Sequence, residues 1–396
     1  MSSLNELLAV PLVDPTRQSY FSRAKLGISL MHRKQHSCSH LTESLGGGVL
    51  TAIKTICDAQ ASIGYATELV YLERLDTPTP EQIQAMFPNS QIIKLGKSNF
   101  TGKCKLFFYS WKILFALEPQ QIIHVHSTIA GTIIRIPNLL LKKVIHYTPH
   151  CYAFQRKDIG LFKKTIYRFI EGGLTRFTPT IVLGCSHAET NIAHLIGAKK
   201  SKYLGNFVAL PAIEYSSDDR VDSLQVIVGT VGRITRQKNL PRYVDLIQNL
   251  EIPIRFNWIG GNEKKEWDLG NERYMNFSGW LSPQETRAEL KKIDVFMLLS
   301  DWEGLPFVAL EAMALGKPVI LWNFDSASEL VTNGLEGYVV NSVEATLSAL
   351  SELLSSPEKR RLMGAAGQKL MRTNFNLTSL PAILSNIYDC CDDAQK

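Results

Sequence analysis

A strand, a loop, a helix and a second strand follow one another between residues 295 and 322, and this unit constrains the fold more than any other stretch. The apolar run at 295–299 is bounded by polar residues, which is typical of a buried strand. Pro306 is predicted as the first helical residue, and residues 307–315 continue the helix up to a glycine. Because a new apolar run follows directly, the unit predicts a parallel α/β sheet, which binds ligands where its strands end.

Two carboxylates in this unit need partners. Glu303 lies in the loop, and Glu311 lies in the middle of a helix whose other residues are apolar. Such a helix is expected to be buried, and a buried Glu is rare unless something pairs with it. Glu311 therefore either reaches solvent or a lysine, or accepts hydrogen bonds from the hydroxyl groups of a ligand.

The stretch EGLPFVALEAMALGKPVI contains both glutamates in an E-x7-E pattern. It resembles the donor-sugar motif of the retaining glycosyltransferases of family 4, which have the GT-B fold of two Rossmann-like domains. The resemblance implies that Glu311 binds the ribose hydroxyls of the nucleotide and that Glu303 approaches the transferred sugar. It also places Gly304 and Leu305 at the donor.

A second match follows the predicted strand at 225–232. Arg233 and Lys238 form a G-R-x4-K arrangement that resembles the diphosphate clamp of the same family. Arg binds phosphate through two parallel hydrogen bonds, and Lys supplies a point charge. The resemblance implies that both cations stabilise the departing diphosphate. Arg236 has no counterpart in the motif and is expected to be solvated.

A glycine run opens the first helix of the chain. Gly46, Gly47 and Gly48 follow a predicted strand at 38–43 and precede a helix at 49–61. A glycine-rich turn at a helix N-terminus allows an anion to approach free N–H groups, although the G-x-G-x-x-G dinucleotide pattern is absent. The resemblance implies that Gly47 and Gly48 face the donor phosphates and that Gly46 faces the acceptor.

Further site candidates stand where predicted strands end. Strands at 121–127 and 144–150 lead to His126 and His150, and the strand at 256–262 runs into Gly260 and Asn262. The resemblance implies that His150 contacts the transferred sugar, with His126 on the acceptor side. It also implies that Gly260 and Asn262 hold the base. Retaining chemistry of this kind does not require a general base.

Metal and disulfide chemistry are not expected. The four-residue spacing of His32, His36 and His40 fits one helix face, but no Cys or carboxylate completes a metal site, so satisfied or exposed histidines are favoured. No D-x-D motif ends a predicted strand, and we therefore predict a metal-independent enzyme without a cofactor. The seven cysteines are unpatterned, which is typical of reduced thiols.

The length of 396 residues favours two domains, at roughly 150 residues for each. We expect an acceptor-binding Rossmann-like domain at 1–205, a linker at 206–224 and a nucleotide-sugar-binding Rossmann-like domain at 225–375. The GT-B layout implies that a C-terminal helix at 376–396 returns to the first domain.

Positive charge is concentrated in the first half of the chain. Residues 1–200 carry 23 Lys and Arg against 12 Asp and Glu. Basic and aromatic residues alternate in predicted helices at 97–117 and 157–169, which favours either solvated lysines on core-facing helices or peripheral contact with an anionic membrane. The sequence shows neither a membrane-spanning apolar run nor a signal-peptide pattern, so we expect a cytoplasmic protein, at the inner face of the membrane if that contact forms.

These features predict a retaining hexosyltransferase with a nucleotide-diphosphate sugar as donor, a UDP-sugar being favoured over a GDP-sugar. The expected acceptor is a saccharide, lipid-linked in the favoured case, in cell-surface polysaccharide or lipopolysaccharide synthesis. The alternatives are a GT-B sugar-nucleotide epimerase, a sugar phosphorylase and a noncatalytic two-domain sugar-binding protein. The sequence contains no RNA-binding signature, so no nucleic-acid partner is expected.

Overall fold

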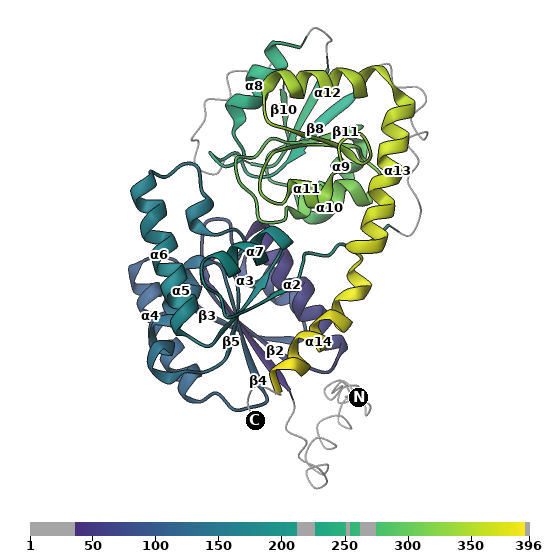
Figure 1. Ribbon diagram of the computed structural model, residues 1–396. Helices are drawn as coiled ribbons and strands as arrows, with labels where there is room; N and C mark the ends of the chain where they lie inside the picture. Colours follow the sequence, from purple (N-terminus) through teal and green to yellow (C-terminus); the bar gives the residue numbers. More distant parts are fainter. Residues whose placement is uncertain (1–35, 212–225, 251–253, 262–274, 393–396) are drawn as a thin grey trace, which may run out of the picture. The chain divides into compact units, whose positions relative to one another are not determined.

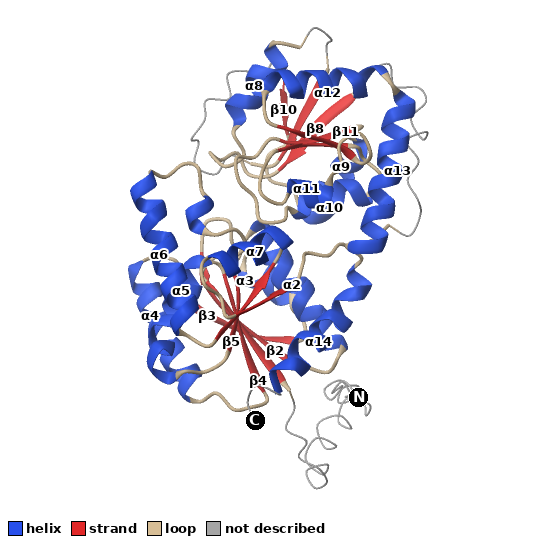
Figure 2. Ribbon diagram, viewed as in Figure 1, coloured by secondary structure: helices blue, strands red, loops and turns tan. Residues whose placement is uncertain are grey.

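The computed structural model describes residues 36–211, 226–250, 254–261 and 275–392. These described residues belong to one compact unit. Within it, the described residues form two parallel β-sheets, each flanked by helices (Figures 1 and 2). Most of the predicted linker at 206–224 lies outside the described residues.

The first sheet has seven parallel strands in the order β3-β2-β1-β4-β5-β6-β7. Its inner strands are covered on both faces, and every residue of β5 and β6 is buried, as expected for a parallel sheet between helices. The strands are β1 (Ser37–Thr42), β2 (Ala66–Glu73), β3 (Ser90–Lys97), β4 (Gln121–His126), β5 (Ile145–Thr148), β6 (Thr180–Gly184) and β7 (Lys200–Tyr203).

Helices pack on this sheet through separate apolar clusters. Leu106 and Ile134 belong to the cluster that joins α4 and α5 to the strands. Ile56 of α2 packs in another cluster with Leu384 of α14, so the last described helix returns to the first sheet (Figure 1). The helices are α2 (Gly47–Ser62), α3 (Pro80–Met86), α4 (Phe100–Phe115), α5 (Thr128–Leu141), a 3-10 turn η1 (Ala153–Gln155), α6 (Leu161–Phe177), α7 (His187–Leu195) and α14 (Leu380–Asp392).

The second sheet has six parallel strands in the order β10-β9-β8-β11-β12-β13. Helix α10 is apolar almost all round and is buried, as its sequence predicts. The strands are β8 (Ile227–Val231), β9 (Arg255–Ile259), β10 (Met275–Phe277), β11 (Val295–Leu298), β12 (Val319–Trp322) and β13 (Gly337–Val340). The helices are α8 (Leu240–Gln248), α9 (Pro283–Lys292), α10 (Phe307–Ala314), α11 (Ala327–Leu330), α12 (Val343–Ser355), α13 (Pro357–Asn374) and the 3-10 turn η3 (Leu377–Ser379).

Strand order reverses once in each sheet, between β1 and β4 and between β8 and β11. At such a point the loops at the carboxyl ends of the two strands leave in opposite directions, and the crevice between them is where open α/β sheets bind ligands. Strand β1 leads to Gly46, β4 ends at His126, β8 leads to Arg233, and β11 leads to Glu303. These four expected site residues therefore lie at or just after the strands that flank the two reversals.

Several local predictions are wrong in detail. Pro306 is the N-cap of α10 rather than its first residue, and α2 begins at Gly47, two residues before the predicted start. Ser186 and Glu189 have the spacing of a capping box, which is typical of a helix start, but this box is only half formed. The N–H of Glu189 donates to the Ser186 hydroxyl, but the Glu189 carboxylate accepts from the N–H groups of Cys185 and Cys151 instead of from the cap.

Candidate functional site

The loops that follow β8 and β11 are tied together by hydrogen bonds. The N–H of Asp301 donates to the Gln237 carbonyl at 2.9 Å, and Gln237 Nε2 donates to the Trp302 carbonyl at 2.7 Å. Lys238 Nζ lies 2.7 Å from Glu303 Oε1, with side chains only 13% and 12% exposed. The structure thus brings Lys238 and Glu303 into direct contact.

A local network holds Lys238 in this position. Asn239 adopts a left-handed conformation at φ 53° and caps α8 by accepting the N–H of Arg242. Asp301 accepts from Arg242 Nη2 at 2.8 Å and from Asn239 Nδ2 at 3.1 Å. No sequence motif includes Asn239, Arg242 or Asp301. The signal was available, because Asp301 and Asn239 are polar residues placed just beyond a predicted strand and just before a predicted helix.

Arg233 is held by a carboxylate that sequence analysis also missed. Its Nη1 lies 2.8 Å from Asp76 Oδ2, and Asp76 also lies 3.2 Å from Nε of Arg74. Gly46 is required beside this pair, because a Cβ there would lie 2.5 Å from Asp76 Oδ2. Gly46 and Arg233 therefore meet at Asp76. Asp76 follows β2 closely, but no sequence motif includes it.

The side chain of Glu311, on α10, has no hydrogen bond or ion pair to any described residue, and the residue is half-buried. Burial raises the pKa of its carboxyl group to about 7, and the positive charge of Arg287 offsets this only in part. A carboxylate that has lost much of its water without gaining a partner is able to accept hydrogen bonds from a ligand. Neither the predicted lysine partner nor another cation contacts it within the described part of the chain.

The glycines of the two helix starts lie close to other site elements. Gly47 has a φ of +51°, which glycine adopts without strain. A Cβ on Gly48 would lie 3.8 Å from Phe307, and one on Gly304 would lie 3.2 Å from the Cys151 nitrogen. The carbonyl of the buried Leu305 accepts from Asn206 at 2.7 Å. The glycine run thus lies beside the first turn of α10.

Gly260 packs directly on the loop that carries Arg233. A Cβ on Gly260 would lie 2.1 Å from the Gly232 carbonyl oxygen, and its own φ is +142°. Only glycine fits there, so Gly260 has a packing role whatever else it contacts. Asn262 lies outside the described residues.

His150 lies two residues beyond β5, in a strained turn. Both His150 and Cys151 have positive φ angles, 53° and 80°, which are uncommon for residues with a side chain. The Cys151 N–H donates to Glu189 Oε1 at 2.6 Å, so the buried carboxylate of α7 holds the turn. Burial lowers the pKa of His150 to about 4, which keeps its imidazole neutral at pH 7.

His150 contacts a cluster of buried histidines. Its Nε2 lies 3.0 Å from His126 Nδ1, and His126 Nε2 lies 2.9 Å from His40 Nδ1. The four-residue spacing of His32, His36 and His40 does not reflect a shared helix face, because His40 lies on strand β1, and His32 is outside the described residues. His40 is a satisfied buried histidine, as the sequence favoured.

His124 lies beside two of these histidines, and His40, His124 and His126 are near enough to share a metal ion. Ligand nitrogens of His40, His124 and His126 lie within 4.8 Å of one another, and all three side chains are buried. Two of these nitrogens already share a hydrogen bond. Three neutral imidazoles would leave the charge of a divalent ion uncompensated at a site without access to water, which is costly. We therefore interpret the cluster as a hydrogen-bonded network.

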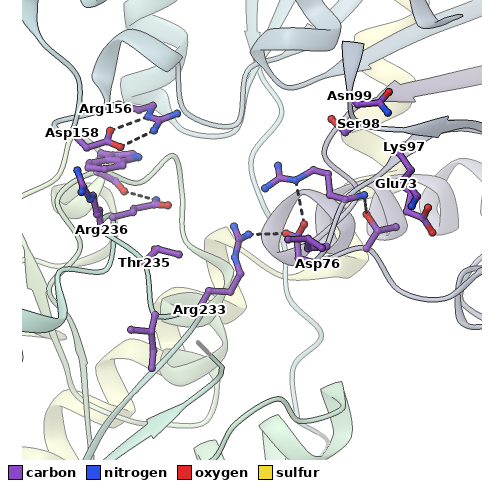
Figure 3. Close-up of a pocket in the computed structure, with 16 residues that line it drawn as sticks. Glu73, Asp76, Lys97, Ser98, Asn99, Arg156, Asp158, Arg233, Thr235 and Arg236 are labelled. Carbon is purple, nitrogen blue, oxygen red and sulfur yellow. Dashed lines mark hydrogen bonds and ion pairs between the residues drawn. The ribbon is translucent and has the colours of Figure 1, made fainter. Parts of the chain in front are cut away.

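A cavity of about 1330 Å³ opens beside Arg233 (Figure 3). Of the expected site residues in the described ranges, Arg233 alone lines it. Five cations and three carboxylates are among its lining residues, so its charge favours an anion. Figure 3 shows Arg156 paired with Asp158, and Arg236, which is exposed as predicted, on the same side. The charged lining residues are Glu73, Arg74, Asp76, Lys97, Arg156, Asp158, Arg233 and Arg236.

Comparison with known proteins gives a family match for the second half of the chain. The model of the family described as glycosyl transferases group 1 matches residues 214–370. An uncharacterized 41.2 kDa protein in the cps region of Klebsiella pneumoniae is 27% identical over 321 residues, which are 77% of this chain and 86% of that protein. UDP-Gal:alpha-D-GlcNAc-diphosphoundecaprenol alpha-1,3-galactosyltransferase of Escherichia coli is 29% identical over 268 residues, 60% of this chain and 67% of that protein.

Solved structures resemble nearly the whole chain. Sucrose-phosphate synthase from Thermosynechococcus elongatus has a TM-score of 0.75 at 17% identity, covering 91% of this chain and 100% of that one. HepE of Anabaena, in complex with UDP and glucose, has a TM-score of 0.73 at 14% identity, covering 90% and 100%. The GT-B fold predicted from the sequence is therefore confirmed. Assignment to family 4 within that fold stays a prediction.

Proposed function

We propose that this chain, which has the GT-B fold and whose residues 214–370 match the glycosyl transferases group 1 family, transfers a hexose from a nucleotide-diphosphate sugar to a saccharide acceptor. The observation that carries the proposal is the contact between Lys238 and Glu303. It places a cation and a carboxylate side by side where two strands at the strand-order reversal end. Arg233 stands on the same loop as Lys238, and Glu311 stands on α10, the helix that follows the loop of Glu303.

The difficult step is departure of the nucleoside diphosphate, because negative charge develops on its phosphate as the anomeric carbon becomes cationic. Arg233 and Lys238 would stabilise that charge, aided by free N–H groups in the first turns of α2 and α10. Glu311 would accept the ribose hydroxyls, and Glu303 would orient Lys238 and a hydroxyl of the sugar. We propose retention of configuration by attack on the same face as the leaving phosphate, without a metal ion or another cofactor.

A UDP-sugar is the favoured donor. The Escherichia coli relative is named for UDP-Gal, and the structural neighbour HepE was solved with UDP and glucose. A GDP-sugar is the alternative donor, because shorter stretches of the chain match GDP-mannose-dependent mannosyltransferases. The base would contact the loop after β9, beyond Gly260.

We further propose a lipid-linked acceptor and peripheral contact with an anionic membrane. The name of the Escherichia coli relative includes a lipid diphosphate acceptor. The cation-rich cavity beside Arg233 has the charge to receive the phosphates of such an acceptor. None of the described helices is long and apolar enough to span a bilayer, so contact would be made by surface helices.

Helices α4 and α6 supply such a surface, which we call the basic-aromatic face. Helix α5 packs between them (Figure 1). Their apolar side chains are between 63% and 83% exposed at seven positions, a larger exposed set than solvent favours. The one acidic residue of the two helices, Glu171, is buried and paired with Arg135. The face consists of Phe100, Phe108 and Phe115 of α4 with Leu161, Phe162, Phe169 and Phe177 of α6, interleaved with Lys105, Lys112, Lys163 and Arg168.

The proposed activity is tested by incubating the protein with UDP- and GDP-hexoses and a diphospholipid-linked saccharide, and by determining the anomeric configuration of any product. A new glycosidic bond with the donor's configuration supports the proposal. An inverted product would refute retention, and an epimerised nucleotide sugar formed without acceptor would favour the epimerase alternative.

A further inference from the structure

Three histidines form a continuous hydrogen-bonded row across the first sheet. His150 Nε2 lies 3.0 Å from His126 Nδ1, and His126 Nε2 lies 2.9 Å from His40 Nδ1. The row ends at α2, where His40 Nε2 lies 2.7 Å from Gln60 Oε1. The rings of each pair are stacked, with centroids 5.3 Å and 5.2 Å apart. A single chain of contacts therefore joins the site turn to the buried side of α2.

The direction of these hydrogen bonds follows from the group at the end. An amide oxygen only accepts, so His40 must carry its proton on Nε2. A neutral imidazole has one N–H, so His40 Nδ1 accepts from His126 Nε2, and His126 Nδ1 in turn accepts from His150 Nε2. Burial keeps all three rings neutral, because it lowers the pKa of His40 and His150 to about 4 and that of His126 well below its ordinary value.

Other neighbours set the orientation of the Gln60 amide. Its Nε2 donates to the Tyr388 hydroxyl of α14 at 2.6 Å, and the buried Cys38 thiol is also in hydrogen-bond contact with this side chain. The contact with Tyr388 uses the amide NH₂ group, and Oε1 is turned toward His40. The returning helix α14 thus takes part in fixing the row.

We propose that His126, His40 and Gln60 are positioning residues that hold His150 protonated at Nε2, so that its Nδ1 is left as an acceptor for a substrate hydroxyl. The inference rests on the proposed function, which assigns Glu303 to the sugar. The backbone of His150 lies beside that loop, because a Cβ on Gly304 would be 3.3 Å from the His150 carbonyl carbon. Among the described residues nothing donates to His150 Nδ1. A free histidine in water exchanges between tautomers. In this row only the Nε2-protonated tautomer of His150 gives each hydrogen bond between His150 and Gln60 one donor and one acceptor.

The tautomer is measured by two-bond ¹H–¹⁵N correlation on the full chain with ¹⁵N-labelled histidine, with His150 assigned from the signals lost in His150→Asn. We expect His150 to be protonated at Nε2 in the unmodified protein. Gln60→Met removes the terminal acceptor and is expected to give a mixture, whereas Gln60→Glu keeps an acceptor and the single tautomer. Thr148→Val is the matched control, because it removes only the hydroxyl that contacts His124, outside the row.

The kinetic consequence separates positioning from folding. Gln60→Met is expected to lower kcat/KM roughly tenfold, the effect of losing the hydrogen bond between the substrate hydroxyl and His150 Nδ1. The kcat/KM of Gln60→Glu should lie closer to that of the unmodified protein. Protonation of His150 at Nδ1, or an unchanged tautomer in Gln60→Met, would overturn the inference. The unmodified spectrum decides the first point even if that variant does not fold. If no donor is turned over, the proposed function fails while the tautomer measurement still stands.

Discussion

Lys238 Nζ lies 2.7 Å from Glu303 Oε1, so the ammonium group that we assign to the leaving diphosphate is oriented by a carboxylate from the neighbouring loop. Glu303→Gln keeps the size of the side chain and removes its charge. We expect kcat to fall roughly 10- to 100-fold, because a hydrogen bond to a charged group contributes about 1.5–3 kcal/mol. Initial rates at saturating donor measure the effect, and an unchanged kcat would remove Glu303 from the mechanism.

Glu311 is expected to make donor binding pH-dependent. Its pKa is raised to about 7 by burial, so the carboxyl group is protonated below that pH and ionised above it. Because an ionised carboxylate is the better acceptor for the ribose hydroxyls, donor affinity is expected to rise between pH 6 and pH 8. Titration calorimetry with UDP and GDP across this range measures the rise.

The matched variant is Glu311→Gln, which cannot ionise. It is expected to reduce the rise in affinity to the part that comes from ionisation of the terminal phosphate of the nucleotide. In the unmodified protein, ionisation of Glu311 opposes folding as the pH rises from its pKa in the unfolded chain towards 7. The variant lacks this loss, so its free energy of unfolding should exceed that of the unmodified protein by more at pH 8 than at pH 5. A binding profile that is the same in both proteins would assign the titration to another group.

The basic-aromatic face is expected to bind anionic vesicles. Phe162→Ser combined with Phe169→Ser removes two exposed rings of α6 without touching the buried cluster, so sedimentation with phosphatidylglycerol vesicles should fall several-fold while the melting temperature is unchanged. Exchanging Lys163 and Arg168 for Gln should weaken binding mainly at low salt. Equal recovery of the unmodified protein with neutral and anionic vesicles would contradict an electrostatic contribution.

Glu189 is expected to control the turn that carries His150. Its carboxylate accepts the N–H groups of Cys151 and Cys185 at 2.6 Å and 2.8 Å. Glu189→Gln replaces one acceptor by an NH₂ group that faces a donor, and should lower the free energy of unfolding by about 1–3 kcal/mol. Urea unfolding measures this loss. Thr190→Val, which alters a neighbouring hydroxyl contact in the same helix, is the control and should cost less.

Much of the fold could be predicted because local patterns and tertiary structure agree. The strand, loop and helix at 295–315 were predicted from an apolar run, a proline and a glycine, and they form almost as expected. The carboxyl ends of parallel strands share an edge, which is why Arg233, Lys238 and Glu303 could be expected near one another. The GT-B assignment, however, came from the resemblance of the motifs and not from periodicity.

What could not be predicted depends on contacts between residues far apart in the chain. Asp76 is one of many acidic loop residues until the fold places it against Arg233. His40 and Gln60 lie in different elements, and only the pairing of β1 with β4 brings His40 to His126. The exposure of the aromatic residues on α4 was also open, because a helix with lysines and aromatics fits either a core or a membrane surface.

The most direct measurement is release of nucleoside diphosphate from a panel of UDP-, GDP- and dTDP-hexoses in EDTA with a diphospholipid-linked saccharide, comparing the unmodified protein with Lys238→Met. The account predicts turnover of one donor that persists in EDTA and falls roughly 100-fold or more in the variant, which lacks the cation at the leaving phosphate. Turnover at equal rates in both proteins, or no release from any donor, would contradict it.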